Sequence, residues 1–106
     1  MDERVIAPSE LAERAEEVAH RLSLLANPSR LLILCRLAEG EASVGTLQAV
    51  VGLSQSALSQ HLAKLREAEL VATRRDAQSV HYRIADAQTE AVMRALYEIF
   101  CRPRTN

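Results

Sequence analysis

The chain has 106 residues, of which 48% are hydrophobic and 25% are charged, and its formal net charge is -1. A chain of this length forms one domain that buries a core without disulfides or metals. Its composition excludes a disordered tail and a disulfide-rich mini-protein. No apolar run is long enough to span a membrane, and the acidic start lacks the apolar segment of a signal peptide. We therefore expect a cytoplasmic protein that does not associate with membranes.

Positive charge is concentrated in the middle of the chain. Residues 43–83 hold five lysines and arginines against three acidic residues, whereas the first 26 residues are acidic. A local basic face on a nearly neutral protein is typical of nucleic-acid binding. A solvated surface with uneven charges is the alternative interpretation of the same pattern.

The first part of the chain predicts two helices. Residues 1–8 are expected to form a flexible lead, and a helix capped by Ser9 follows to about Leu25. This helix carries one apolar stripe at close to heptad spacing. A second helix, capped by Asn27, runs to about Leu37 and is apolar nearly all round, which predicts burial on most sides.

Residues 43–68 predict a helix-turn-helix. A short helix over 43–50 is broken by Gly52, and a second helix runs from Ser54 to about Ala68. The second helix has one apolar face and one polar face. Two short helices joined by a turn that contains glycine are typical of this motif.

A change of period follows the helix-turn-helix. Residues 70–76 and 79–84 are short β-prone runs, and the second alternates between apolar and polar side chains. With the turn at 76–78, they predict a β-hairpin wing over 70–84. A last helix is expected over 86–101. This order of elements is that of a winged helix-turn-helix. We therefore expect a mainly α fold with a β-hairpin wing, of the α+β class, as a single domain over 1–106.

The start of the second helix-turn-helix helix has the side chains that a recognition helix needs. Small polar groups let such a helix enter the major groove, and their donors and acceptors reach base edges. Arginines in the hairpin suit a phosphate or a narrow minor groove. An exposed polar face without a ligand is the alternative for the helix taken alone. The predicted DNA-binding residues are Ser54, Gln55, Ser56, Ser59, Gln60, His61, Lys64, Arg74, Arg75 and Gln78.

Two stretches carry a more specific pattern. They are ANPSRLLILCRL, from residue 26, and GLSQSALSQHLAKLREAELVATRRDAQSVHYRI, from residue 52. Together they resemble the ArsR family of bacterial transcriptional repressors. The resemblance implies a homodimer that pairs its first and last helices and binds double-stranded DNA at an inverted-repeat operator. The predicted interface residues are Leu11, Ala15, Val18, Leu22, Val92, Leu96 and Ile99.

Many members of this family sense metal ions at two known positions. The first helix of the helix-turn-helix here has no cysteine, and the last helix begins Asp86-Ala87-Gln88 and contains no histidine. The three histidines of the chain lie in three separate predicted elements. Zinc prefers four ligands in a tetrahedron, and this chain does not supply them. We expect no metal and no cofactor, with a metal-responsive repressor as an alternative.

The chain has two cysteines, Cys35 and Cys101. Each alone is explained by packing or by chance, because cysteine behaves as a small hydrophobe. As a pair they resemble the sulfide- and persulfide-responsive branch of the family. The resemblance implies sensing thiols that react with reactive sulfur species, form a disulfide or polysulfide bridge, and release the operator. A repressor that senses peroxide through the same thiols is an alternative.

A small thiol enzyme and a dimeric interaction module are two further classes of function. The chain has no Cys-x-x-Cys motif, no glycine-rich phosphate loop and no catalytic triad pattern. Neither cysteine begins a predicted helix, where the helix dipole would activate a thiol. We therefore expect no enzymatic activity and no catalytic residues. An interaction module would differ from a repressor in having lost DNA binding.

Overall fold

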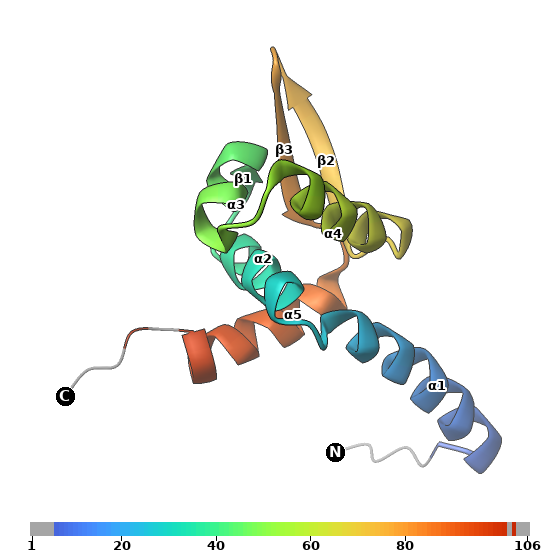
Figure 1. Ribbon diagram of the computed structural model, residues 1–106. Helices are drawn as coiled ribbons and strands as arrows, with labels where there is room; N and C mark the ends of the chain where they lie inside the picture. The colour runs from blue at the N-terminus through green and yellow to red at the C-terminus, as the bar shows by residue number, and fades with distance from the viewer. Residues whose placement is uncertain (1–5, 102, 104–106) are drawn as a thin grey trace.

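The computed structural model describes residues 6–101 and 103, and the side chain of Cys101 lies outside the described part. The order of elements is that of a winged helix-turn-helix, as predicted (Figure 1). The strands form one antiparallel sheet in the order β1-β3-β2. The elements are α1 (Pro8–Leu25), α2 (Pro28–Ala38), β1 (Ala42–Ser43), α3 (Val44–Val51), α4 (Gln55–Glu67), β2 (Val71–Asp76), β3 (Ser79–Ile84), α5 (Ala87–Leu96) and the π-helical segment η1 (Tyr97–Cys101).

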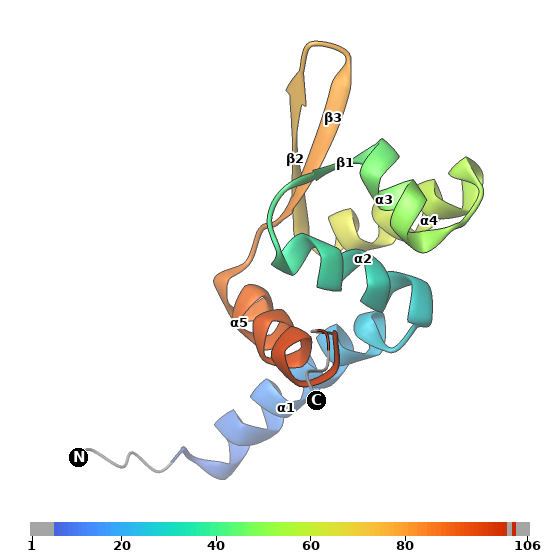
Figure 2. The same ribbon diagram turned by 90° about the vertical axis from the view of Figure 1, so that its left-hand side faces the viewer.

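The molecule has two ends with α2 between them. The wing projects at one end, beside α3 and α4, whereas α1 and α5 lie at the other end (Figures 1 and 2). Helix α2 contacts α3, α4 and β3 on one side and α1, α5 and η1 on the other. A displacement of α2 relative to α5 would therefore change the contacts that α2 makes with α3 and α4.

The core surrounds α2. Its fully buried side chains come from four helices and from the residue before β2, and they are Ile33, Leu34, Leu47, Leu58, Leu65, Leu70 and Met93. Burial of each such side chain stabilises the fold by about 1.5–3 kcal/mol. The prediction that α2 is buried on most sides is confirmed for its core face but is wrong for Leu32, which is 45% exposed.

The helix starts agree with the predicted caps except at α1. Asn27 accepts a hydrogen bond from the backbone N–H of Arg30 at 3.1 Å, as a cap does. The prediction for Ser9 is wrong, because α1 begins at Pro8 and no side chain caps it. Proline has a fixed φ that suits the first helical position. The expected lead over 1–8 thus loses Pro8 to the helix, and 1–5 lie outside the described residues.

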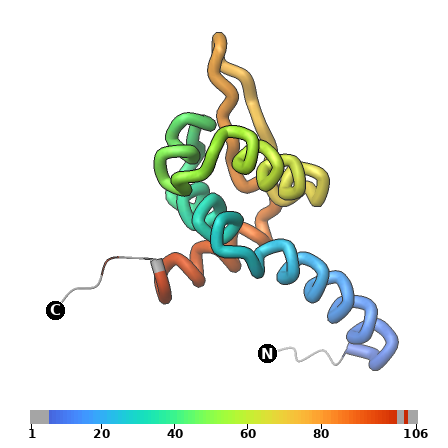
Figure 3. Tube along the Cα trace, in the orientation of Figure 1, coloured from blue at the N-terminus to red at the C-terminus, as the bar shows by residue number. Residues whose placement is uncertain are grey.

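Helix α1 has few contacts with the rest of the chain. Leu25 is its one buried residue, and every residue from Pro8 to Ser23 is exposed. The tube in Figure 3 shows this helix projecting from the body of the molecule. None of the helices in the described part of the chain is long and apolar enough to cross a bilayer.

Candidate nucleic-acid interface and thiol site

The turn of the helix-turn-helix is fixed by hydrogen bonds at the end of α3 and at the start of α4. Gly52 ends α3 in the left-handed region, with φ 73°, which a glycine adopts without strain. The side-chain amide of Gln48 donates to the carbonyl of Leu53 at 3.2 Å. Ser54 then caps α4 by accepting from the N–H of Ala57 at 3.1 Å. Gln48 was missed by the sequence analysis, since nothing in its spacing distinguishes it from a surface residue.

Helix α4 presents one polar face to solvent. Leu58, Leu62 and Leu65 anchor its other face in the core. The predicted DNA-binding residues of α4 and its cap are exposed, except His61, which is half-buried. The first N–H groups of a helix attract anions such as phosphate. The geometry therefore offers a rigid helix start with small polar side chains beside the projecting wing (Figure 1).

The wing ends in a two-residue turn, Ala77-Gln78, and Ala77 has a positive φ of 58°. Arg75 and Gln78 are exposed near this tip. Arg74 is engaged differently, because its Nε donates to both carboxylate oxygens of Glu41, at 3.0 and 2.8 Å. The Glu41–Arg74 pair was missed by the sequence analysis, since 33 residues separate its members.

The electrostatics of the wing centre on Glu41. The hydrogen bonds from Arg74 lower the pKa of this carboxyl group, and the charge of Arg74 and the nearby His81 and Arg83 lower it further. In turn, Glu41 raises the pKa of Arg74. Both shifts favour the charged forms, so the pair is ionised at neutral pH.

Asp86 joins α5 to α1. Its carboxylate caps α5 by accepting from the N–H of Thr89 at 2.8 Å and from its hydroxyl at 2.7 Å. The same oxygen accepts from Arg21 of α1 at 2.9 Å. The bonds from Thr89, and then Arg21, lower the pKa of Asp86. Aspartate is a preferred cap residue, so its place at the start of the predicted last helix could have revealed this role.

The residues considered for a metal site are spread over the molecule. His20, His61 and His81 lie in α1, α4 and β3, and Asp86 is committed to Thr89 and Arg21. Among the described side chains, no group of three or more histidine, cysteine, aspartate or glutamate residues could hold a metal ion.

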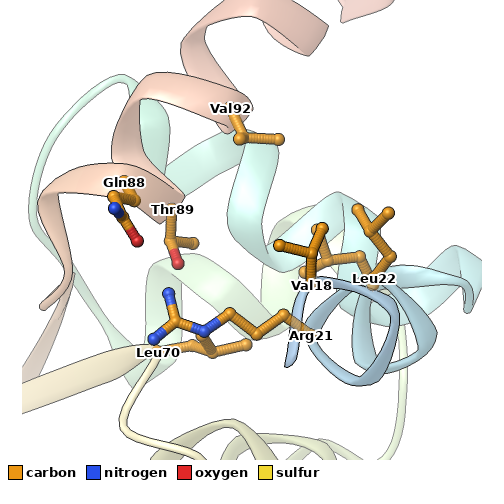
Figure 4. Close-up of a pocket in the computed structure, with 8 residues that line it drawn as sticks. Val18, Arg21, Leu22, Leu70, Gln88, Thr89 and Val92 are labelled. Atoms are coloured by element: carbon orange, nitrogen blue, oxygen red, sulfur yellow. The ribbon is translucent and has the colours of Figure 1, made fainter. Parts of the chain in front are cut away.

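An apolar pocket lies between α1 and α5, near the Arg21–Asp86 pair. Figure 4 shows its lining, in which the tip of Arg21 lies below Gln88 and Thr89. The lining is Val18, Arg21, Leu22, Leu25, Leu70, Gln88, Thr89 and Val92. Five of the seven predicted interface residues are large hydrophobic side chains with exposed fractions of 41–67%, namely Leu11, Val18, Leu22, Val92 and Ile99. Ala15 is also exposed, and Leu96 is half-buried.

Cys35 lines a second apolar pocket, on the side of α2 that faces the end of the chain. The pocket is lined by Pro28, Leu31, Leu32, Cys35, Leu96 and Phe100. Phe100 immediately precedes Cys101, whose side chain lies outside the described residues. The guanidinium of Arg36, the residue after Cys35, donates to the carbonyl of Gly40 at 3.1 Å. The pocket wall next to Cys35 is therefore apolar.

Comparisons with known proteins agree with this geometry. The biofilm growth-associated repressor of Agrobacterium fabrum is 48% identical over 96 residues, which cover 91% of this chain and 82% of the relative. The nodulation protein NolR of Rhizobium meliloti is 52% identical over 93 residues, covering 88% and 76%.

Solved structures give the same result. The transcriptional repressor BigR from Xylella fastidiosa superposes with a TM-score of 0.79 at 42% identity, covering 92% of this chain and all of that one. Reduced HlyU from Vibrio cholerae gives a TM-score of 0.83 at 42% identity, covering 88% and 98%. Residues 27–73 match the family described as bacterial regulatory protein, arsR family. The chain therefore belongs to the arsR family of bacterial regulatory proteins.

Proposed function

We propose that this chain is a transcriptional repressor that binds an inverted-repeat operator as a homodimer. The observation that carries DNA binding is the exposed polar start of α4, anchored by three buried leucines beside the wing. The predicted contacts are those of the sequence analysis, with base edges read at the start of α4 and phosphates bound further along and by the wing. The relatives named as repressors support the same function.

A second copy of the chain would cover the exposed stripes of α1 and α5. Contiguous exposed apolar surface on a small protein marks an interaction site. A two-fold axis beside α1 and α5 leaves the α4 helices free at the opposite end of each protomer (Figure 2). Such a dimer presents two recognition helices to successive major grooves, ~34 Å apart.

The proposed signal is a reactive sulfur species that modifies Cys35 and Cys101. A thiolate attacks the outer sulfur of a persulfide, takes that sulfur, and expels the donor as a thiolate. The other cysteine thiolate then attacks the sulfur bound to the protein, so a disulfide forms and hydrosulfide leaves. Further sulfane sulfur would give a polysulfide bridge instead. The proposal is supported by the place of Cys35 on a pocket wall with Phe100, the neighbour of Cys101.

Helix α2 would transmit the modification to DNA. Cys35 lies on α2, and η1, which ends at Cys101, contacts the same helix. The buried face of α2 packs against α3 and α4. A bridge between α2 and η1 would shift the two recognition helices relative to each other. A coupling of ~1–3 kcal/mol lowers operator affinity by about 5- to 150-fold.

The test combines intact mass with operator binding. The reduced protein first selects its operator from a library of random duplexes. It is then treated with a sulfane-sulfur donor or with hydrogen peroxide. We expect a donor-specific mass gain that links the Cys35 and Cys101 peptides, together with release of DNA. Cys35→Ser and Cys101→Ser should bind the operator as before and should not respond. Release of DNA from either variant would contradict the two-thiol switch, and an equal response to peroxide would favour a general thiol sensor.

A further inference from the structure

The two edge strands of the wing sheet are joined by an ion pair. The Nε of Arg74 in β2 donates hydrogen bonds to the carboxylate of Glu41, and one terminal nitrogen forms an ion pair with the same group. Glu41 directly precedes β1. The terminal nitrogen lies 2.8 Å from a carboxylate oxygen. Strand β3 separates β1 from β2, so the pair reaches across the middle strand. Side-on pairs of this kind are stronger and more directional than single-point contacts.

The pair lies on the face of the wing that points away from the core. Residues opposite each other in an antiparallel pair share a face, so Arg74, His81 and Ser43 point to one side. Val71 and Tyr82 point to the other side and are buried. Successive residues of a strand alternate, and Arg75 therefore shares the face of Val71, which is the side of the helix-turn-helix.

The charge of Arg74 is compensated by two carboxylates. Two nitrogens bind Glu41, and the third lies 3.9 Å from a carboxylate oxygen of Asp76. A DNA phosphate that binds the Nε side of Arg74 must displace Glu41, and a phosphate at the other terminal nitrogen meets a guanidinium whose charge Glu41 already compensates. The released carboxylate of Glu41 would then repel the phosphate. Among the described residues, Arg75 has no ion pair to break.

We infer that Glu41 limits the affinity of the wing for DNA by holding Arg74, so that Arg75 is the arginine of the wing that binds a phosphate. The inference rests on the proposed DNA binding and changes the role of one residue within it. Arg74 becomes a latent contact that Glu41 keeps out of the interface. Glu41 is then a residue that sets affinity without touching DNA.

The experiment measures binding of a short duplex of mixed sequence by fluorescence anisotropy over a series of KCl concentrations. Phosphate contacts are independent of sequence, and each one adds about 0.9 to the slope of log affinity against log salt. Glu41→Gln should bind about tenfold more tightly, with a slope steeper by about 0.9 for each wing that contacts the duplex, or about 1.8 for the dimer. Arg74→Ala should stay within about twofold of the unaltered protein. Arg75→Ala should lose about tenfold, with a slope shallower by about 0.9 for each wing, or about 1.8 for the dimer.

The double variant Glu41→Gln with Arg74→Ala is the control for simple removal of a negative charge. Its affinity should return to within about twofold of the unaltered protein, because the gain depends on the freed arginine. The inference is overturned if this double variant keeps the gain, if Glu41→Gln shows none, or if Arg74→Ala alone makes the slope shallower. Absence of binding by the unaltered protein at low salt would refute the proposed function, and the inference with it.

Discussion

Replacing Ser54 with alanine tests two roles of one hydroxyl group. Its oxygen accepts the N–H of Ala57 at 3.1 Å and so caps α4. Loss of a serine cap costs about 1 kcal/mol of folding free energy, which lowers the melting temperature of a chain of this size by about 4 °C. The hydroxyl hydrogen of Ser54 stays available to donate to DNA. Its loss should weaken operator binding about fivefold for each half-site, the equivalent of one hydrogen bond in each protomer.

Ser43 provides a matched control. It caps α3 by accepting from the N–H of Thr46 at 3.2 Å, and its hydroxyl hydrogen is donated to the side chain of Thr46 at 3.1 Å. Ser43→Ala should therefore cost a similar amount of stability and leave operator affinity unchanged. Thermal unfolding by circular dichroism and operator titration by fluorescence anisotropy measure the two effects separately.

The comparison of the two variants decides the role of Ser54. If both weaken DNA binding equally, the loss follows from helix stability, and Ser54 makes no DNA contact. If Ser54→Ala unfolds at the same temperature as the unaltered protein, the cap seen in the structure contributes nothing. The first result would refute the DNA contact of Ser54, and the second would refute its contribution to stability.

Three further predictions follow from other contacts. Met93→Ala should lower the free energy of unfolding by about 2–5 kcal/mol in urea titrations, since Met93 is fully buried; a smaller loss would mean that the core collapses around the cavity. Asp86→Asn should be less stable than the unaltered protein at neutral pH. Because the pKa of Asp86 is lowered in the folded protein, its contribution to the free energy of unfolding is complete above the unfolded pKa of about 4 and is lost as the pH falls through the folded pKa. Plots of the free energy of unfolding against pH for the variant and the unaltered protein should therefore converge in acid, and parallel plots would contradict this. Leu22→Glu should give a monomer in sedimentation experiments, because Leu22 is half exposed in the single chain and a dimer through α1 would bury it; an intact dimer would exclude α1 from the interface.

Most of the fold was predictable because its signals are local. Asn27 before Pro28 and Gly52 between α3 and α4 act within a few residues, and the structure confirms both. Strand β1 was missed because two residues are too few to show alternation, and its pairing depends on β3. The last helix was expected to be regular to Cys101, but it changes to a π-helix at Tyr97. No spacing in the sequence marks that change.

The candidate site likewise contains features that could be predicted from the sequence and features that could not. The polar face of α4 could be predicted, since helical periodicity assigns its exposed residues. The Glu41–Arg74 and Arg21–Asp86 pairs could not, because 33 and 65 residues separate their members and only the folded chain brings them together. The residues available for DNA contact could therefore be predicted, while the structure shows which of them already have another partner.

The sparse attachment of α1 has a consequence for how the protein responds to its own concentration. An isolated helix of this length is marginal in water, and α1 is tied to its own body by little more than Leu25 and the Arg21–Asp86 pair. In the proposed dimer, the partner supplies the missing apolar contacts. Dissociation would then melt α1 as well as separate the protomers. Dilution should thus produce a chain with an exposed, protease-sensitive first helix, so repressor that has not found a partner would be removed first.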